Sequence, residues 1–143
     1  MSIWHPWRAL RDDHPRMDVA FPHIDVVGCY GRRNGSRIEI ESTSNQAERR
    51  CTLTHEIIHV ERGPVPKHPY FGPQEERIVR RLTAERLIEL EPLVDALAWN
   101  RWQVDADTAG DLWVDLPTLV TRVKNLTEDE RRYIDAEIER RQP

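Results

Sequence analysis

Long hydrophobic runs are missing from this chain of 143 residues, in which 38% of the residues are hydrophobic and 32% are charged. A membrane-spanning helix needs about 20 predominantly apolar residues, and no run approaches that length. The first residues, MSIWHPWRALRDDHPR, also lack the continuous apolar core of a secretory signal. We therefore expect no membrane segment and predict a cytoplasmic protein with one compact domain, or one domain and a small helical appendage.

Cysteine is scarce, and Cys29 and Cys51 are the only two residues of this type. Because no secretory signal is expected, we predict two reduced thiols rather than a disulfide. An excess of basic residues is also missing, since the formal net charge is −4 at pH 7. Such a charge provides no general attraction to nucleic acid or to anionic membranes, so we expect neither as a partner.

The N-terminal part of the chain contains a short β-rich region. Asp25–Tyr30 and the alternation around Ile38 and Ile40 predict two strands, and the dipeptide Asn34-Gly35 between them is a turn signal. We therefore predict a hairpin or a small sheet edge, preceded by a segment that is irregular or briefly helical.

Two helical stretches follow the predicted hairpin. The first begins at a capping residue, Ser44 or Asn45, and ends at Gly63. A loop of eleven residues, GPVPKHPYFGP, contains four prolines and two glycines and would return the chain antiparallel. The second helix opens near Gln74 and ends near Pro92. The predicted fold class is α+β, with a small antiparallel sheet or hairpin packed on these two helices and a helical subdomain after them.

The C-terminal third, residues 92–143, is predicted to be a helical subdomain that follows a first domain of residues 1–91. Residues 106–126 have the pattern of a helix-turn-helix, but two short packed helices would give the same pattern. Residues 91–126 carry three basic side chains and six acidic ones, which argues against phosphate contacts. We therefore expect the subdomain to pack on the first domain or to recognise a protein partner. Its core is predicted to include three tryptophans: Trp99, Trp102 and Trp113.

The stretch LTHEIIHVERG in the first helix contains the pattern His55-Glu56-x-x-His59. On a helix, histidines four residues apart lie on one face, so both imidazoles can reach a single metal ion. The glutamate after the first histidine can take a proton from the attacking water and pass it to the leaving amine. The alternative is a solvated helical turn that contains histidines by chance. We predict a zinc site with Glu56 as catalytic general base and acid.

A catalytic zinc site usually has three protein ligands and one open position. No third histidine follows the motif in the pattern of the metzincins, so we expect a carboxylate from the second helix. That helix opens with Glu75 and Glu76, and helical geometry alone does not separate them. Both could instead be first-turn acids that the helix dipole favours.

A peptidase also needs a donor that stabilises the oxyanion of the tetrahedral intermediate. His68 and Tyr70, in the loop between the two helices, are chemically suitable candidates. In the alternative interpretation, either side chain is simply exposed or packed.

The runs RCTLTHEIIHVERG and QEERIVRRLTAERLI resemble the ImmA/IrrE-like zinc metallopeptidases, most of all short members of that family carried by actinobacterial phages. In that family a similar His-Glu-x-x-His helix precedes a helix that supplies a glutamate ligand and continues to an Ala-x-x-Leu-Ile-like segment, matched here by residues 84–88. Matching back from this segment, Glu76 best fits the ligand position and Glu75 is the alternative.

The resemblance implies an intracellular zinc-dependent endopeptidase whose metal is bound by His55, His59 and Glu76. It also implies a protein substrate, such as the repressor of a phage or mobile element, and a role in the regulation of lysogeny. One alternative is a non-proteolytic regulatory protein that binds a metal and whose C-terminal helices bind a protein partner or DNA. Another is a metal-free helical module.

Overall fold

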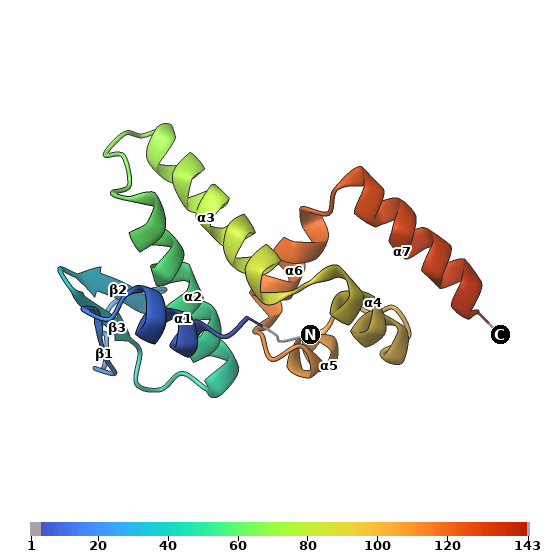
Figure 1. The fold of residues 1–143 in the computed structure, drawn as a ribbon, viewed down its shortest axis with the longest axis horizontal. Helices are drawn as coiled ribbons and strands as arrows, with labels where there is room; N and C mark the ends of the chain where they lie inside the picture. The colour runs from blue at the N-terminus through green and yellow to red at the C-terminus, as the bar shows by residue number, and fades with distance from the viewer. Residues whose placement is uncertain (1–3, 143) are drawn as a thin grey trace.

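The computed structural model describes residues 4–142, and this part of the chain forms seven helices and one three-stranded sheet (Figure 1). This arrangement confirms the α+β fold class. None of the described helices combines the length and the apolar character that crossing a membrane requires. In chain order the elements are α1 (Pro6–Asp13), β1 (Asp18–Ala20), β2 (Gly31–Asn34), β3 (Arg37–Ile40), α2 (Gln46–Arg62), α3 (Phe71–Leu87), α4 (Leu90–Trp99), α5 (Ala106–Asp111), α6 (Leu116–Lys124) and α7 (Glu128–Arg141).

Strands β2 and β3 form the predicted hairpin, with Gly35 and Ser36 in the turn between them. Gly35 has a φ of 64°. A positive φ at the first position of a two-residue turn is typical of type II′, and glycine adopts it without steric cost. Strand β1 pairs with β3 in parallel, so the order of the sheet is β1-β3-β2 and β2 lies at an edge.

The strand predicted at Asp25–Tyr30 is wrong, because this segment is a loop and strand β2 begins only at Gly31. Val26 and Val27 are both exposed in the loop. β-branched residues favour a strand because they pack well on a half-buried pleated face, and these two valines have no such face. The sequence analysis also does not anticipate the short strand β1, which gives the sheet its parallel pair.

Helix α2 begins at the predicted cap. The Asn45 side chain accepts a hydrogen bond from the Glu48 backbone N–H (2.8 Å), and the Glu48 carboxylate accepts one from the Asn45 N–H (2.9 Å). This reciprocal capping satisfies two of the N–H groups that the helix leaves free at its start. The helix ends before Gly63, which has a φ of 94°. Leu53 and Ile57, on the inner face of α2, share an apolar cluster with Ile38 and Ile40 of β3.

After the proline-rich loop the chain returns along α3, which lies beside α2 (Figure 1). Helix α3 differs from the predicted helix at both ends: it begins at Phe71, inside the predicted loop, rather than near Gln74, and it ends at Leu87 rather than near Pro92. Pro92 lies instead in the first turn of α4. A proline is tolerated there because the N–H that it lacks would have no partner within the helix.

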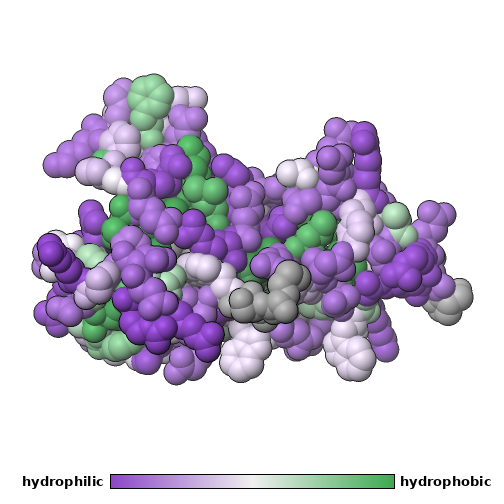
Figure 2. All heavy atoms as spheres, viewed as in Figure 1, coloured by the Kyte–Doolittle hydropathy of each residue, from purple (hydrophilic) through white to green (hydrophobic). Residues whose placement is uncertain are grey.

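Hydrophilic residues cover most of the face of the molecule that Figure 2 shows. Inside, a second apolar cluster joins α2 and α3 to the C-terminal helices. Cys51 and Leu87 lie in this cluster together with Leu93, Leu119 and Ile134, so residues on both sides of the predicted domain boundary share one core.

Two of the three tryptophans predicted to form the core of the C-terminal helices lie outside it. Trp102 packs against the cluster, but Trp99 and Trp113 are 83% and 67% exposed. Trp99 lies on the face of α4 opposite Leu93 and Leu97, which are buried. The indole of Trp113 is exposed from the turn between α5 and α6.

Candidate metal centre

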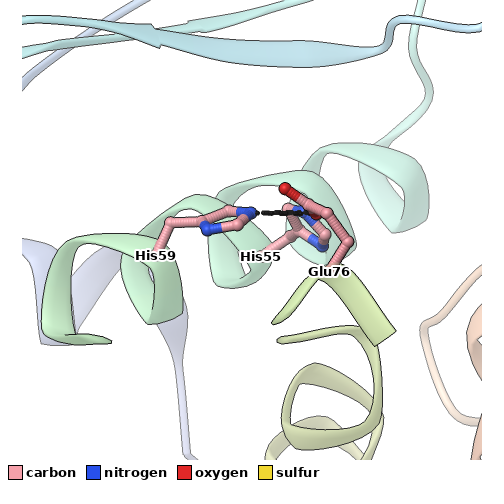
Figure 3. Close-up of side chains that lie close together, drawn as sticks. All are labelled: His55, His59 and Glu76. Carbon is pink, nitrogen blue, oxygen red and sulfur yellow. Dashed lines mark hydrogen bonds and ion pairs between the residues drawn. The ribbon is translucent and has the colours of Figure 1, made fainter. Parts of the chain in front are cut away.

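His55, His59 and Glu76 converge on one point between α2 and α3 (Figure 3). The two Nε2 atoms of the histidines lie 3.1 Å apart. The Glu76 Oε2 atom lies 3.2 Å from Nε2 of His59 and 3.4 Å from Nε2 of His55. All three ligand atoms lie within 4.8 Å of one another, so this group could hold a metal ion.

The convergence depends on the reversal between the two helices. His55 and His59 are one turn apart on α2, and Glu76 lies in the second turn of α3, where that helix runs past α2. The loop that precedes α3 is closed by His68, whose Nδ1 accepts hydrogen bonds from the backbone N–H groups of Tyr70 (3.1 Å) and Phe71 (3.2 Å). His68 therefore satisfies N–H groups at the start of the helix that carries Glu76.

Glu75 is directed to a different partner. Its carboxylate accepts two hydrogen bonds from the Arg62 guanidinium, at 2.6 Å and 2.8 Å. These hydrogen bonds lower the pKa of Glu75 from its usual value. The geometry thus places Glu76 with the histidines and Glu75 in an ion pair at the end of α2.

Both histidines are partly buried. For His55, burial favours the neutral imidazole over the charged one. Burial lowers the pKa of His55 to about 4, and the neighbouring His59 adds to this effect, whereas the charge of Glu76 opposes it. A neutral imidazole has a free nitrogen lone pair, which is the form that binds metal ions.

Glu56 lies beside this group and is itself buried, with 7% of its surface exposed. Burial raises the pKa of its carboxyl group, and the charge of Glu76 also raises it, while His59 and Arg33 lower it. Within the described residues the carboxylate has no hydrogen-bond partner, and it lines a cleft that His55 and Glu76 also line. Glu56 is therefore placed to exchange protons with a group in that cleft.

The cleft has a volume of about 450 Å³ and is bounded by four elements. The loop before β2 and the middle of α2 form two walls, α3 forms the third, and the start of α6 closes the fourth. β2 approaches α2 closely at Gly31, where any Cβ would overlap the methyl group of Thr52. The residues that line the cleft are Gly28, Cys29, Tyr30, Gly31, Cys51, Thr52, His55, Glu56, Glu76, Arg80, Thr83, Asp115, Pro117, Thr118 and Thr121.

The two candidates for stabilising an oxyanion, His68 and Tyr70, do not line this cleft. His68 is engaged at the start of α3, and Tyr70 is 61% exposed against Phe71. The sequence analysis missed Tyr30 and Arg80, which do line it. Arg80 could have been found from its spacing, because it follows Glu76 by one helical turn and so shares its face.

Comparisons with protein-family models, with curated proteins and with solved structures find no match for this chain.

Proposed function

We propose that this chain is a zinc-dependent endopeptidase that cleaves a regulatory protein. The observation that carries the proposal is the convergence of His55, His59 and Glu76 beside a buried glutamate, Glu56, at the wall of a cleft. Two imidazoles and one carboxylate are the ligands of several catalytic zinc sites, which retain an open position for water or substrate.

The spacing of the three ligand atoms suits zinc. Two ligands that each lie about 2.0–2.1 Å from a tetrahedral zinc ion are separated by roughly 3.3 Å. The three separations here are 3.1 Å between the histidines and 3.2 Å and 3.4 Å to the glutamate oxygen. The donor set therefore fits the ion without rearrangement of the two helices.

Glu56 supplies the proton transfer in this proposal. Zinc, when bound, would act as a Lewis acid on the peptide carbonyl and make water a better nucleophile at neutral pH. Glu56 would accept the proton from the attacking water and deliver it to the amine of the leaving peptide. The raised pKa of Glu56 favours this role, because a group that must both accept and donate works best when its pKa is near the working pH.

The edge strand β2 offers a place for an extended peptide. In an antiparallel pair, alternate residues direct their backbone groups away from the partner strand. The Tyr30 carbonyl accepts a hydrogen bond from the Glu41 N–H (2.8 Å), so the backbone groups of Gly31 and Arg33 point to the free edge. A substrate added as a further strand would pair with these groups, and Gly31 also lines the cleft.

Arg80 is the better-placed donor for the developing oxyanion. It lines the cleft, and its positive charge lowers the pKa of His55. His68 and Tyr70 lie outside the cleft. No carboxylate of residues 4–142 pairs with it, so its guanidinium is available to a bound substrate. A positively charged donor at this place would stabilise the negative charge that develops on the carbonyl oxygen in the transition state.

The resemblance to the ImmA/IrrE-like metallopeptidases supports the same reaction. It rests on RCTLTHEIIHVERG in α2 and on QEERIVRRLTAERLI in α3. It further implies that the substrate is the repressor of a phage or mobile element, so we include such a repressor among the proteins to be tested.

The first prediction concerns Glu56→Gln, which keeps the shape of the side chain but removes its ability to take a proton. We expect the variant to retain one equivalent of zinc and to lose about 10²- to 10⁴-fold in cleavage rate. The measurement is mass spectrometry of peptides released from a candidate repressor and from a mixture of unfolded proteins. Glu61→Gln is the matched control, because Glu61 is an exposed acid on the same helix, paired with Arg86.

Two outcomes would count against the proposed peptidase activity. Unchanged cleavage in Glu56→Gln would exclude Glu56 as the proton-transfer group. Zinc binding by the unaltered chain without cleavage of any protein would favour the alternative of a non-proteolytic regulatory protein.

A further inference from the structure

The two exposed tryptophans line the same groove on the C-terminal helices. The groove lies between α4 and the end of α5, and it shares no lining residue with the cleft at the histidines. Tryptophan is strongly buried on average, so exposure of 83% for Trp99 and 67% for Trp113 on one feature is unusual. The residues that line this groove, which we call the tryptophan groove, are Pro92, Asp95, Ala96, Trp99 and Gly110–Trp113.

Trp113 is held in place at an energetic cost. Its φ is 59°, a left-handed conformation that residues other than glycine rarely adopt because it is strained. The Arg50 guanidinium donates hydrogen bonds to the carbonyls of Leu112 (3.2 Å) and Trp113 (3.0 Å), and the Trp113 N–H donates to Gly110 (3.1 Å). The surrounding backbone therefore fixes a conformation that keeps a large apolar side chain in solvent. Burial of the Trp113 side chain does not compensate for this strained conformation, because the side chain is exposed.

One side chain also links the two helices on either side of the tryptophan groove. The side-chain amide of Asn100 donates one hydrogen bond to the Ala96 carbonyl in α4 and another to the Asp111 carboxylate at the end of α5, both at 2.8 Å. This amide connects the two walls directly. A groove that is formed before binding loses less entropy when a partner enters it.

Two carboxylates line the tryptophan groove, and one of them, Asp95, is paired with an arginine outside the groove. Asp95 and Asp111 are its charged lining residues, and no lysine or arginine lines it. Asp111 uses one oxygen for Asn100, and Asp95 has an exposed side chain that pairs with Arg141 at 3.1 Å. Aromatic faces flanked by carboxylates bind guanidinium groups well, because arginine can stack on an indole and pair with a carboxylate in one geometry.

We propose that the tryptophan groove binds a short arginine-containing segment of a protein partner. The guanidinium would stack on an indole and pair with Asp111, and apolar neighbours of the arginine would contact the second indole. A short segment fits better than a second copy of this chain. Two tryptophans bury about 150–250 Å² each, whereas stable association of two folded proteins usually buries about 800 Å² on each partner.

The test uses the full chain and a short fluorescein-labelled peptide in which arginines alternate with leucine and proline. We expect saturable binding by fluorescence anisotropy, and we expect Trp113→Ser and Asp111→Asn each to weaken it roughly tenfold or more. Asp111→Asn retains a side-chain oxygen that can still accept the hydrogen bond of Asn100. Circular dichroism and thermal unfolding check that each variant is folded.

Two control variants separate the tryptophan groove from general effects. Asp107→Asn makes the same change in net charge on the same helix, but Asp107 does not line the groove. Phe71→Ser removes an aromatic side chain that is 53% exposed on α3. Neither control should change binding. His59→Ala should bind the peptide unchanged, so a failure of the metal site and a failure of this proposal are distinguishable.

Several results would overturn the proposal. One is equal binding of a peptide with citrulline in place of arginine, and another is equal weakening by Asp107→Asn and Asp111→Asn. A dimer in sedimentation that Trp113→Ser dissociates would assign the groove to a second copy of the chain. Binding of duplex DNA that Trp113→Ser abolishes would assign it to nucleic acid.

Discussion

Two consecutive glutamates have different partners at the start of α3. Consecutive residues of a helix point about 100° apart, so only one of them can face α2 at the level of the histidines. Glu76 takes that position, and Glu75 pairs with Arg62 at the end of α2. The ion pair of Glu75 with Arg62 also joins the two helices that carry His55, His59 and Glu76.

This difference predicts unequal effects of two neighbouring substitutions. Loss of a residue that only forms a hydrogen bond with a metal ligand lowers metal affinity roughly 10–100-fold. Glu76→Ala removes a proposed ligand itself, so we expect it to lower zinc affinity by more than this. Glu75→Ala should cost less, because it removes a partner of Arg62 and leaves all three ligands. Competition with a coloured chelator measures both affinities. The reverse order would remove Glu76 from the site.

Helix α6 is held by a buried charge, Arg122, which is only 4% exposed. Its guanidinium donates to the Ile88 carbonyl between α3 and α4 (2.8 Å) and to both oxygens of Glu130 in α7 (3.2 Å and 2.6 Å). A single side chain thus connects α6, the start of α7 and the point where α3 ends. Because α6 closes one wall of the cleft, this contact also positions the cleft.

Loss of Arg122 should therefore destabilise the whole C-terminal half. Arg122→Ala removes the basic partner of the partly buried Glu130 carboxylate, which keeps only its hydrogen bond with the Thr127 N–H (3.0 Å). We expect a cost of about 3–5 kcal/mol in the free energy of unfolding. Arg132→Ala is the control, since Arg132 forms an exposed pair with Glu128 within one helix and should cost about 0.5 kcal/mol or less. Urea unfolding followed by circular dichroism gives both values, and equal values would contradict this role.

At the scale of the whole molecule, two carboxylates accept several hydrogen bonds each: Glu41, directly after β3, and Glu130, in the first turn of α7. Glu41 accepts hydrogen bonds from the Ile24 N–H (2.8 Å) and the Ser42 hydroxyl (3.1 Å), and its Oε1 lies 3.0 Å from Nδ1 of His23. Burial raises its pKa, but these hydrogen bonds outweigh burial and hold the pKa at about 2. The Arg122 hydrogen bonds hold the pKa of Glu130 at about 2 as well, against the effect of burial.

These low pKa values predict how stability depends on pH. A carboxyl whose pKa is lower in the folded than in the unfolded chain stabilises the fold above its unfolded pKa, about 4.5 here. This stabilisation is lost as the pH falls toward 2. We expect the free energy of unfolding to fall from pH 5 to pH 3, and to fall less steeply in Glu41→Gln. Urea titrations at both pH values measure this slope. Glu139→Gln, an exposed control on α7, should not change it.

Much of the local structure could be predicted from the sequence. The cap at Asn45, the end of α2 at Gly63 and the turn at Gly35 depend on backbone hydrogen bonds and φ angles within a few residues. The strand expected at Asp25–Tyr30 could not be corrected in this way, because a strand of β-branched residues also needs a face to bury them. The same reason applies to Trp99, whose environment depends on what packs against α4.

For the site, the sequence by itself determined that His55 and His59 share one face and that Glu56 accompanies them, because helical geometry requires only that the helix forms. Helical geometry left Glu75 and Glu76 open, and the resemblance favoured Glu76, which the tertiary structure brings to the histidines. Only the tertiary structure decided that Arg80 and the start of α6 line the cleft and that Trp99 and Trp113 remain exposed. These outcomes depend on how α3 packs on α2 and on how α4 and α5 pack on each other. Such distances join residues far apart in the chain, and no local pattern encodes them.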